Sequence, residues 1–154
     1  MQIDDLLGAW RANCSVNFQL LNLCSDDDLE LKPGKGKTIR SNFVHIVGIR
    51  RAHIEDRMPK DASSISKLDW KEASRQEIVD ALKVSDQLIE KYLTQLEEIR
   101  KPAKWTPARF LAYNVAHEAN HRSQIEIALR LNGREPSIAE LYRLWDGWKV
   151  GVAK

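Results

Sequence analysis

Four long segments of the chain carry apolar residues at intervals of three and four, and this spacing predicts amphipathic helices. They cover residues 3–22, 39–56, 75–100 and 107–132. None of them alternates apolar and polar residues as a half-buried strand would. The sequence therefore predicts an all-α protein built as a four-helix bundle.

Capping signals mark where the predicted helices begin and end. The start signals, in chain order, are Thr38, Ser74 with Glu77, Thr106 before Pro107, and Ser137 with Glu140. Ser137 predicts a short extra C-terminal helix. We expect Pro59, Lys101-Pro102 and Gly133 to end the second, third and fourth helices. Residues 57–73 then form a long connection, and connections of this length permit crossovers and often border a functional site.

Composition limits the classes of protein to which the chain can belong. It has 154 residues, of which 43% are hydrophobic, and we expect one domain over 1–154. Its net charge of +2 gives no sign of the concentrated basic surface that nucleic-acid binding usually needs. No apolar run is long enough to span a membrane, and the acidic start, Met1 to Asp5, lacks the layout of a signal peptide. We expect a cytoplasmic protein that acts on a small molecule.

One stripe of the segment 107–132 is polar in its middle. Its members recur at steps of four and three and so share one helix face: Phe110, Asn114, His117, His121, Gln124, Ala128 and Leu131. If this face is buried, each unpartnered polar group costs about 1–3 kcal/mol. The polar residues at its centre therefore need partners or a ligand.

His117 and His121 are spaced so that both imidazoles can reach one metal ion. A hydrogen-bonded pair of core histidines is the alternative. A third histidine ligand would come from the second helix, where His45 lies in an apolar stretch and His53 lies among charged residues. Glu140 is a possible carboxylate ligand but fits better as a capping residue. We therefore favour His45 as the ligand and expect His53 at the surface. Three histidines would leave a coordination position open for water or substrate.

The same residues also match H-E-x-x-H, the zinc-protease signature, with Glu118 as the general base. This short pattern recurs by chance, and the chain shows no strand to hold a peptide. Glu118 also lies about 100° round the helix from His117, and we expect that it is not an essential base. A metallopeptidase is therefore the weaker alternative.

The run His117-Glu118-Ala119-Asn120-His121-Arg122-Ser123-Gln124-Ile125, followed by Leu129 and Gly133, resembles the last core helix of the DinB/YfiT-like family. Upstream, Leu29, Lys32-Pro33, Thr38-Ile39 and His45-Ile46 are similar to the family's loop and second helix. Lys37-Thr38 departs from that pattern, because many members have an aromatic residue before a Ser there. The resemblance covers nearly the whole chain.

The resemblance implies a four-helix bundle that binds a divalent metal, often zinc or nickel, through His45, His117 and His121. Some relatives are transferases or isomerases that use a low-molecular-weight thiol, and many have no known activity. A metal with an open position lowers the pKa of a bound thiol or water. Two function classes remain open: a metal-dependent transferase or hydrolase, and a non-catalytic metal- or ligand-binding bundle.

Several neighbouring residues are candidates for supporting roles. Arg122 belongs to the family motif and could grip a substrate carboxylate, although we favour a structural salt bridge. Gln124 could orient a ligand of the metal, or it could serve only hydrogen bonding in the core. We expect Cys14 and Cys24 to be small buried residues rather than nucleophiles, since a reactive thiol needs an electropositive, exposed setting.

Four apolar residues near the C-terminus have little chain left to cover them: Leu141, Leu144, Trp145 and Trp148. Exposed apolar patches usually mark an interface, so we expect a homodimer. The alternative is that this tail folds back on its own bundle.

Overall fold

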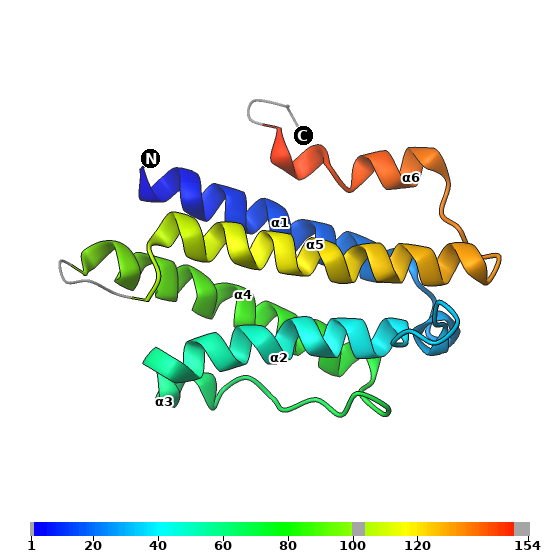
Figure 1. Ribbon diagram of the computed structural model, residues 1–154, viewed down its shortest axis with the longest axis horizontal. Helices are drawn as coiled ribbons and strands as arrows, with labels where there is room; N and C mark the ends of the chain where they lie inside the picture. The colour runs from blue at the N-terminus through cyan, green and yellow to red at the C-terminus, as the bar shows by residue number, and fades with distance from the viewer. Residues whose placement is uncertain (1, 100–103, 150–154) are drawn as a thin grey trace.

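The computed structural model describes residues 2–99 and 104–149, and four long helices dominate it (Figure 1). They are α1 (Ile3–Leu23), α2 (Ile39–Arg57), α4 (Arg75–Glu98) and α5 (Pro107–Leu131). The shorter elements are η1 (Asp27–Glu30), α3 (Pro59–Ala62), α6 (Ile138–Arg143) and η2 (Asp146–Trp148). No strand occurs within the described ranges, so the predicted all-α bundle with a short C-terminal helix is confirmed. None of the helices in these ranges has the length and apolarity that a bilayer crossing requires.

The bundle is not a simple up-and-down arrangement. α1 and α2 each pack against both α4 and α5, which places α1 and α2 on opposite corners. α1 and α5 run in one direction, and α2 and α4 run in the other (Figure 1). The connection from α1 to α2 therefore crosses the end of the bundle, which its length of about 15 residues allows.

The predicted capping residues occupy the helix starts. The Thr38 side chain accepts a hydrogen bond from the Ser41 amide, and Thr106 accepts one from the Arg109 amide. Ser74 and Ser137 each form a complete capping box. Gly133 follows α5 with a φ of 71°, a conformation that favours glycine. The stop predicted at Lys101-Pro102 lies outside the described residues.

The connection between α2 and α4 is more ordered than the sequence predicted. Pro59 follows the end of α2, as expected, but it also opens the short helix α3 because proline fits the first turn of a helix. The chain from 63 to 74 then returns alongside α2 (Figure 1). Arg40 of α2 donates hydrogen bonds to the carbonyls of Lys71 and Ala73 and so ties the end of this segment to the bundle.

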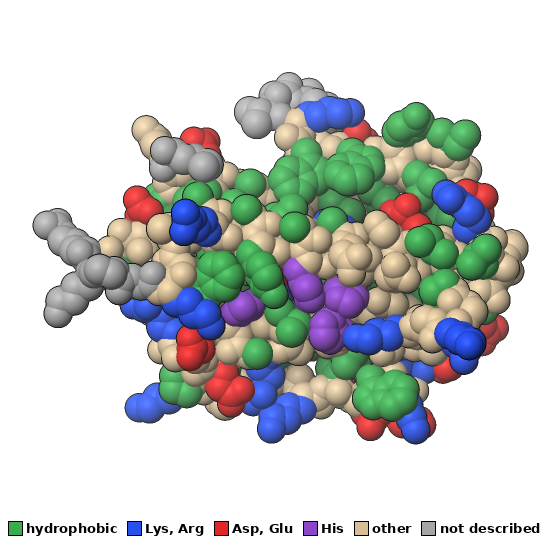
Figure 2. Space-filling model, viewed as in Figure 1, with side chains coloured by type: hydrophobic (Ala, Val, Ile, Leu, Met, Phe, Trp, Pro, Cys, Tyr) green, Lys and Arg blue, Asp and Glu red, His purple; other side chains and the backbone are tan. Residues whose placement is uncertain are grey.

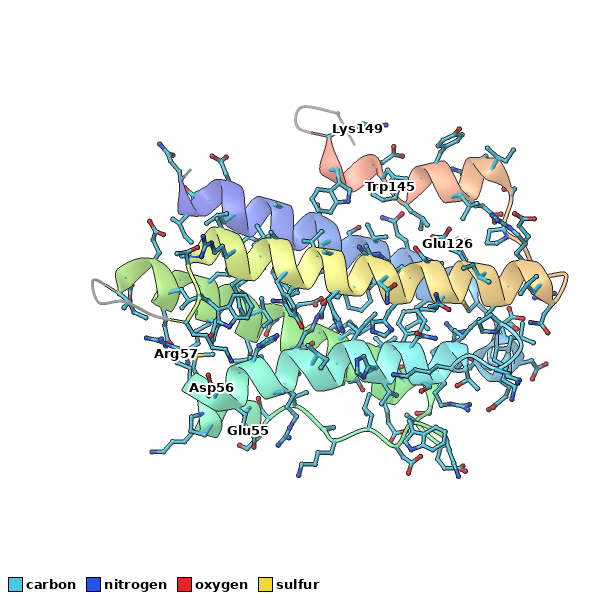
Figure 3. The ribbon with its side chains drawn as sticks, in the orientation of Figure 1. Glu55, Asp56, Arg57, Glu126, Trp145 and Lys149 are labelled. Carbon is cyan, nitrogen blue, oxygen red and sulfur yellow. The ribbon has the colours of Figure 1, made fainter. Side chains whose placement is uncertain are left out.

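The C-terminal segment folds back on its own bundle. η2 packs against α1, and Leu144 is only 3% exposed. Leu141 and Trp148 pack against the core, whereas Trp145 stays 54% exposed (Figure 3). The expectation that all four residues lack cover is therefore wrong for three of them, because the chain turns after α5 and lies along α1.

A buried ion pair joins α2 to α5 inside the apolar core. Arg50 is fully buried, and its Nε and Nη2 atoms donate to the Glu118 carboxylate at 2.6 and 3.0 Å. The Arg50 Nη1 atom also donates to Ser85 at 3.1 Å and to Asp86. The guanidinium carbon of Arg50 lies 4.6 Å from the centre of the Trp10 ring. This pair therefore connects three of the four long helices, with α1 covering it.

Replacing Arg50 by Met keeps most of the side-chain volume but leaves Glu118 buried without its counter-ion. We expect the free energy of unfolding to fall by about 3–5 kcal/mol, measured by urea denaturation. Arg51→Met is the matched control, because Arg51 is the next residue on α2 and pairs with Glu55 at the surface. That variant should change stability by less than about 1 kcal/mol. Equal losses in the two variants would contradict this account.

Candidate metal centre

Three of the four histidines come together between α2 and α5. His45 comes from α2, and His117 and His121 lie one turn apart on α5. One ring nitrogen of each lies within 4.8 Å of those of the other two. The Nε2 atoms of His117 and His121 are 3.3 Å apart, and no hydrogen bond occupies the His117 Nδ1 atom. Figure 2 shows histidine side chains at the surface of this face, so the cluster is open to solvent.

Asn42 fixes the orientation of the His121 ring. The Asn42 side-chain amide donates to the Thr38 carbonyl at 3.0 Å, which turns its oxygen towards His121. That oxygen lies 2.8 Å from His121 Nδ1. The hydrogen of neutral His121 must therefore be on Nδ1, and the lone pair of Nε2 faces the other two histidines. This is the arrangement in which a carbonyl-type oxygen orients a metal-ligating histidine.

The electrostatic surroundings keep the three imidazoles neutral. Burial, together with the nearby His117, His45 and Lys37, lowers the pKa of His121 to about 4. Burial and Lys37 also lower the pKa values of His45 and His117. A histidine binds a metal only in its neutral form. The donor set, its protonation and its spacing therefore fit a transition-metal ion.

Glu118 faces away from this cluster. Its carboxylate is buried and accepts hydrogen bonds from Asn13 at 2.6 Å and Asn17 at 2.8 Å, in addition to those from Arg50. Burial by itself would raise the pKa of Glu118, but the charge of Arg50 holds it below its ordinary value. A carboxylate so occupied is not placed to take a proton from a water molecule at the histidines. The geometry thus gives no support to the H-E-x-x-H interpretation.

The other two supporting candidates differ in their surroundings. Arg122 is buried, donates to the Asn17 side chain at 2.9 Å and lies 3.7 Å from Glu118, so it belongs to the ion network of the core. Gln124 is half-buried one turn beyond His121, and its amide makes no hydrogen bond within the described part of the chain.

His53 is not the solvated residue that its charged neighbours suggested. Its ring packs edge-on against Phe110, Trp105 and Tyr113, with centroid distances of 5.2–6.0 Å. Its Nε2 atom is buried without a hydrogen-bond partner. Tyr113 also stacks on His117, with a centroid distance of 6.0 Å and an angle of 7°. His53 therefore lies beside the cluster, behind Tyr113, and is not part of it.

The two cysteines are both free and buried. Burial raises the pKa of the Cys14 thiol and raises that of Cys24 to about 12. Both thiols therefore stay protonated at neutral pH, which agrees with the prediction that neither is a nucleophile.

The low pKa of His121 makes the metal-free protein sensitive to acid. The unfolded chain protonates this histidine near its ordinary pKa of 6.5, and the folded chain does so only near 4. The unfolded state thus binds more protons in that range, and stability should fall as the pH drops from about 6.5 to 4. Histidine NMR titration with a chelator present, alongside denaturation at each pH, measures both effects. Titration of His121 near 6.5 would contradict this expectation.

Comparison with known proteins agrees with the resemblance inferred from the motifs around His45 and His121. The sequence model of the DinB family matches residues 1–149, which is nearly the whole chain. No curated protein and no solved structure gives a significant match. A family model that spans nearly the full length of a helical bundle establishes membership: this chain belongs to the DinB family.

Proposed function

We propose that this protein binds one divalent metal ion, zinc or nickel, through His45, His117 and His121, and that it is an enzyme. In this proposal the ion supplies one kind of chemistry, which is to lower the pKa of a small thiol or water molecule at its open position. A thiol or water activated in this way would be the nucleophile toward an electrophilic small-molecule substrate. The observation that carries the proposal is the convergence of three imidazole nitrogens within 4.8 Å of one another, on two half-buried histidines and one buried histidine.

The chain's own residues support this function in three ways. Asn42 holds the His121 lone pair towards the cluster. The ion pair with Arg50 keeps the Glu118 carboxylate in the core, so that Glu118 does not bind the metal ion or take a proton at the centre. The buried cysteines leave the open position to an external thiol, because neither can ionise near neutral pH.

We also propose that the protein is a homodimer. α6 and the turn after it leave a patch of exposed apolar side chains, which are Ile138, Tyr142 and Trp145. Trp145 lies on the C-terminal segment between α6 and η2 (Figure 3). A second copy of the chain would remove this patch from water.

Metal analysis of variants tests the proposed ligands. After incubation with zinc or nickel and removal of the excess, the wild type should retain one ion per chain. His45→Ala, His117→Ala and His121→Ala should each lose it, because two remaining ligands hold an ion weakly. His53→Ala is the matched control and should retain the ion, since His53 lies outside the cluster. Asn42→Ala should weaken metal affinity by about 10–100-fold. Equal metal content in all variants would overturn the site.

A spectroscopic measurement tests whether the metal centre admits a thiol. Cobalt replaces zinc in such sites and reports its ligands by absorption. Adding dithiothreitol to the cobalt-loaded protein should produce a thiolate-to-cobalt band, because the open position admits a thiol. If cobalt binds but the spectrum does not respond to the thiol, the thiol form of the proposal is wrong, and only water activation or a non-catalytic function remains.

Sedimentation tests the dimer. The wild type should sediment as a dimer at micromolar concentration, and Trp145→Ser should shift it towards monomer because the apolar patch shrinks. Trp70→Ser is the control, since Trp70 is equally exposed but lies beside α2, away from α6. A monomeric wild type would contradict the proposal.

A further inference from the structure

A trough runs along α2 away from the three-histidine cluster. Its first part has a volume of about 500 Å³ and is lined by Lys37, Ser41, Val44, His45, Gly48 and Trp70. A second part of about 170 Å³ shares Val44 and Gly48 with the first and extends to Arg51 and Lys67. The two parts therefore adjoin, with α2 as one wall and the chain that follows α3 as the other (Figure 1).

The walls of the trough are apolar in the middle and basic at both ends. Val44 and Gly48 form the shared central part. The charged side chains among the described lining residues are all cationic: Lys37 at the histidine end, and Arg51 and Lys67 at the far end. Ser41 to Arg51 spans ten residues of helix, or about 15 Å. The trough thus has room for an extended small molecule.

Two of these cationic side chains can each form a further interaction with a ligand. Lys37 forms no ion pair with the part of the chain that the structure describes, and its charge reaches all three histidines, since it lowers their pKa values. The Arg51 Nη1 atom pairs with Glu55 at 3.3 Å, but its Nε atom is buried without a hydrogen-bond partner. A buried donor without a partner is unfavourable, and a ligand that accepts the hydrogen bond would satisfy it.

We propose that the trough binds the non-reacting part of the small molecule that enters the three-histidine centre, and that this part carries an anionic group, a carboxylate or a phosphate. Arg51 at the far end binds the anion through its unpartnered Nε atom, Val44 and Gly48 contact the apolar portion, and the charge of Lys37 at the histidine end adds a longer-range attraction. The placement of the reacting end at the histidines rests on the proposed function. The anion site itself rests only on the trough and its cations.

Binding of small anions to the metal-free protein tests this site without any activity assay. Glutarate has two carboxylates joined by an apolar chain, and glutaramide is its uncharged counterpart. In the ¹⁵N-labelled protein with a chelator present, glutarate should shift the amide signals of Ser41, Val44 and Gly48, and glutaramide should not. Inorganic phosphate is titrated in parallel. The anion that binds more tightly shows whether the site prefers a carboxylate or a phosphate. Binding should weaken as salt is added.

Paired variants locate the bound anion. Arg51→Gln should weaken binding about fivefold, the loss of one ion pair. Lys37→Gln should weaken it less, because Lys37 acts on the anion only through its longer-range charge. Lys83→Gln, on the exposed face of α4, should leave binding unchanged. Gly48→Leu should abolish binding by filling the trough, and it should fold, because a Cβ atom there meets nothing within 4 Å. Gly8→Leu is the matched control, since Gly8 is a helical glycine with the same free space on α1.

The outcomes separate this inference from the proposed function. If neither glutarate nor phosphate shifts the α2 amides, or if Gly48→Leu still binds the anion, the inference is overturned even where the wild type retains its metal. If glutaramide binds as tightly as glutarate, the anionic requirement is wrong. If the anion binds as expected but the wild type retains no metal, the anion site stands and the proposed function fails.

Discussion

The orientation of the histidine cluster depends on the buried ion pair between Arg50 and Glu118. Glu118 directly follows His117, so the two side chains point about 100° apart on α5. Arg50 lies five residues after His45, which places it about 140° round α2. When Arg50 and Glu118 meet in the core, His45 and His117 must both turn towards the open edge between the two helices. One contact thus sets the rotation of both helices that carry the cluster.

A buried pair of charges persists only where its surroundings satisfy it. Desolvation removes most of the energy that two buried charges gain from each other. Here Asn13 and Asn17 of α1 donate to Glu118, and Ser85 of α4 accepts from Arg50. The remaining helices thereby complete the pair. These side chains around Arg50 and Glu118 form one connected network, and removing a member leaves a buried charge or donor without a partner.

Features that depend on residues close together in the chain were predicted from the sequence. Helix ends at Thr38, Ser74 and Ser137 followed from capping chemistry, and the meeting of His117 with His121 followed from their spacing on one helix. The sequence could not predict what depends on packing between helices. Asn42 was missed because nothing in its neighbourhood marks it as a partner of a residue 79 positions away. His53 was misplaced because charged neighbours along the chain do not reveal the aromatic residues that α5 brings against it.

At Gly48, the residue that would best stabilise helix α2 differs from the residue that leaves the trough open. It lies in the interior of α2, where glycine is less favourable than alanine by about 1 kcal/mol. Alanine would fit, because a Cβ atom there meets nothing within 4 Å. A chain optimised only for folding would therefore carry alanine at this position and a smaller hollow beside His45. Glycine leaves that space open at the expense of helix stability, and side chains of graded size at this one position offer a means to change which molecules the bundle admits.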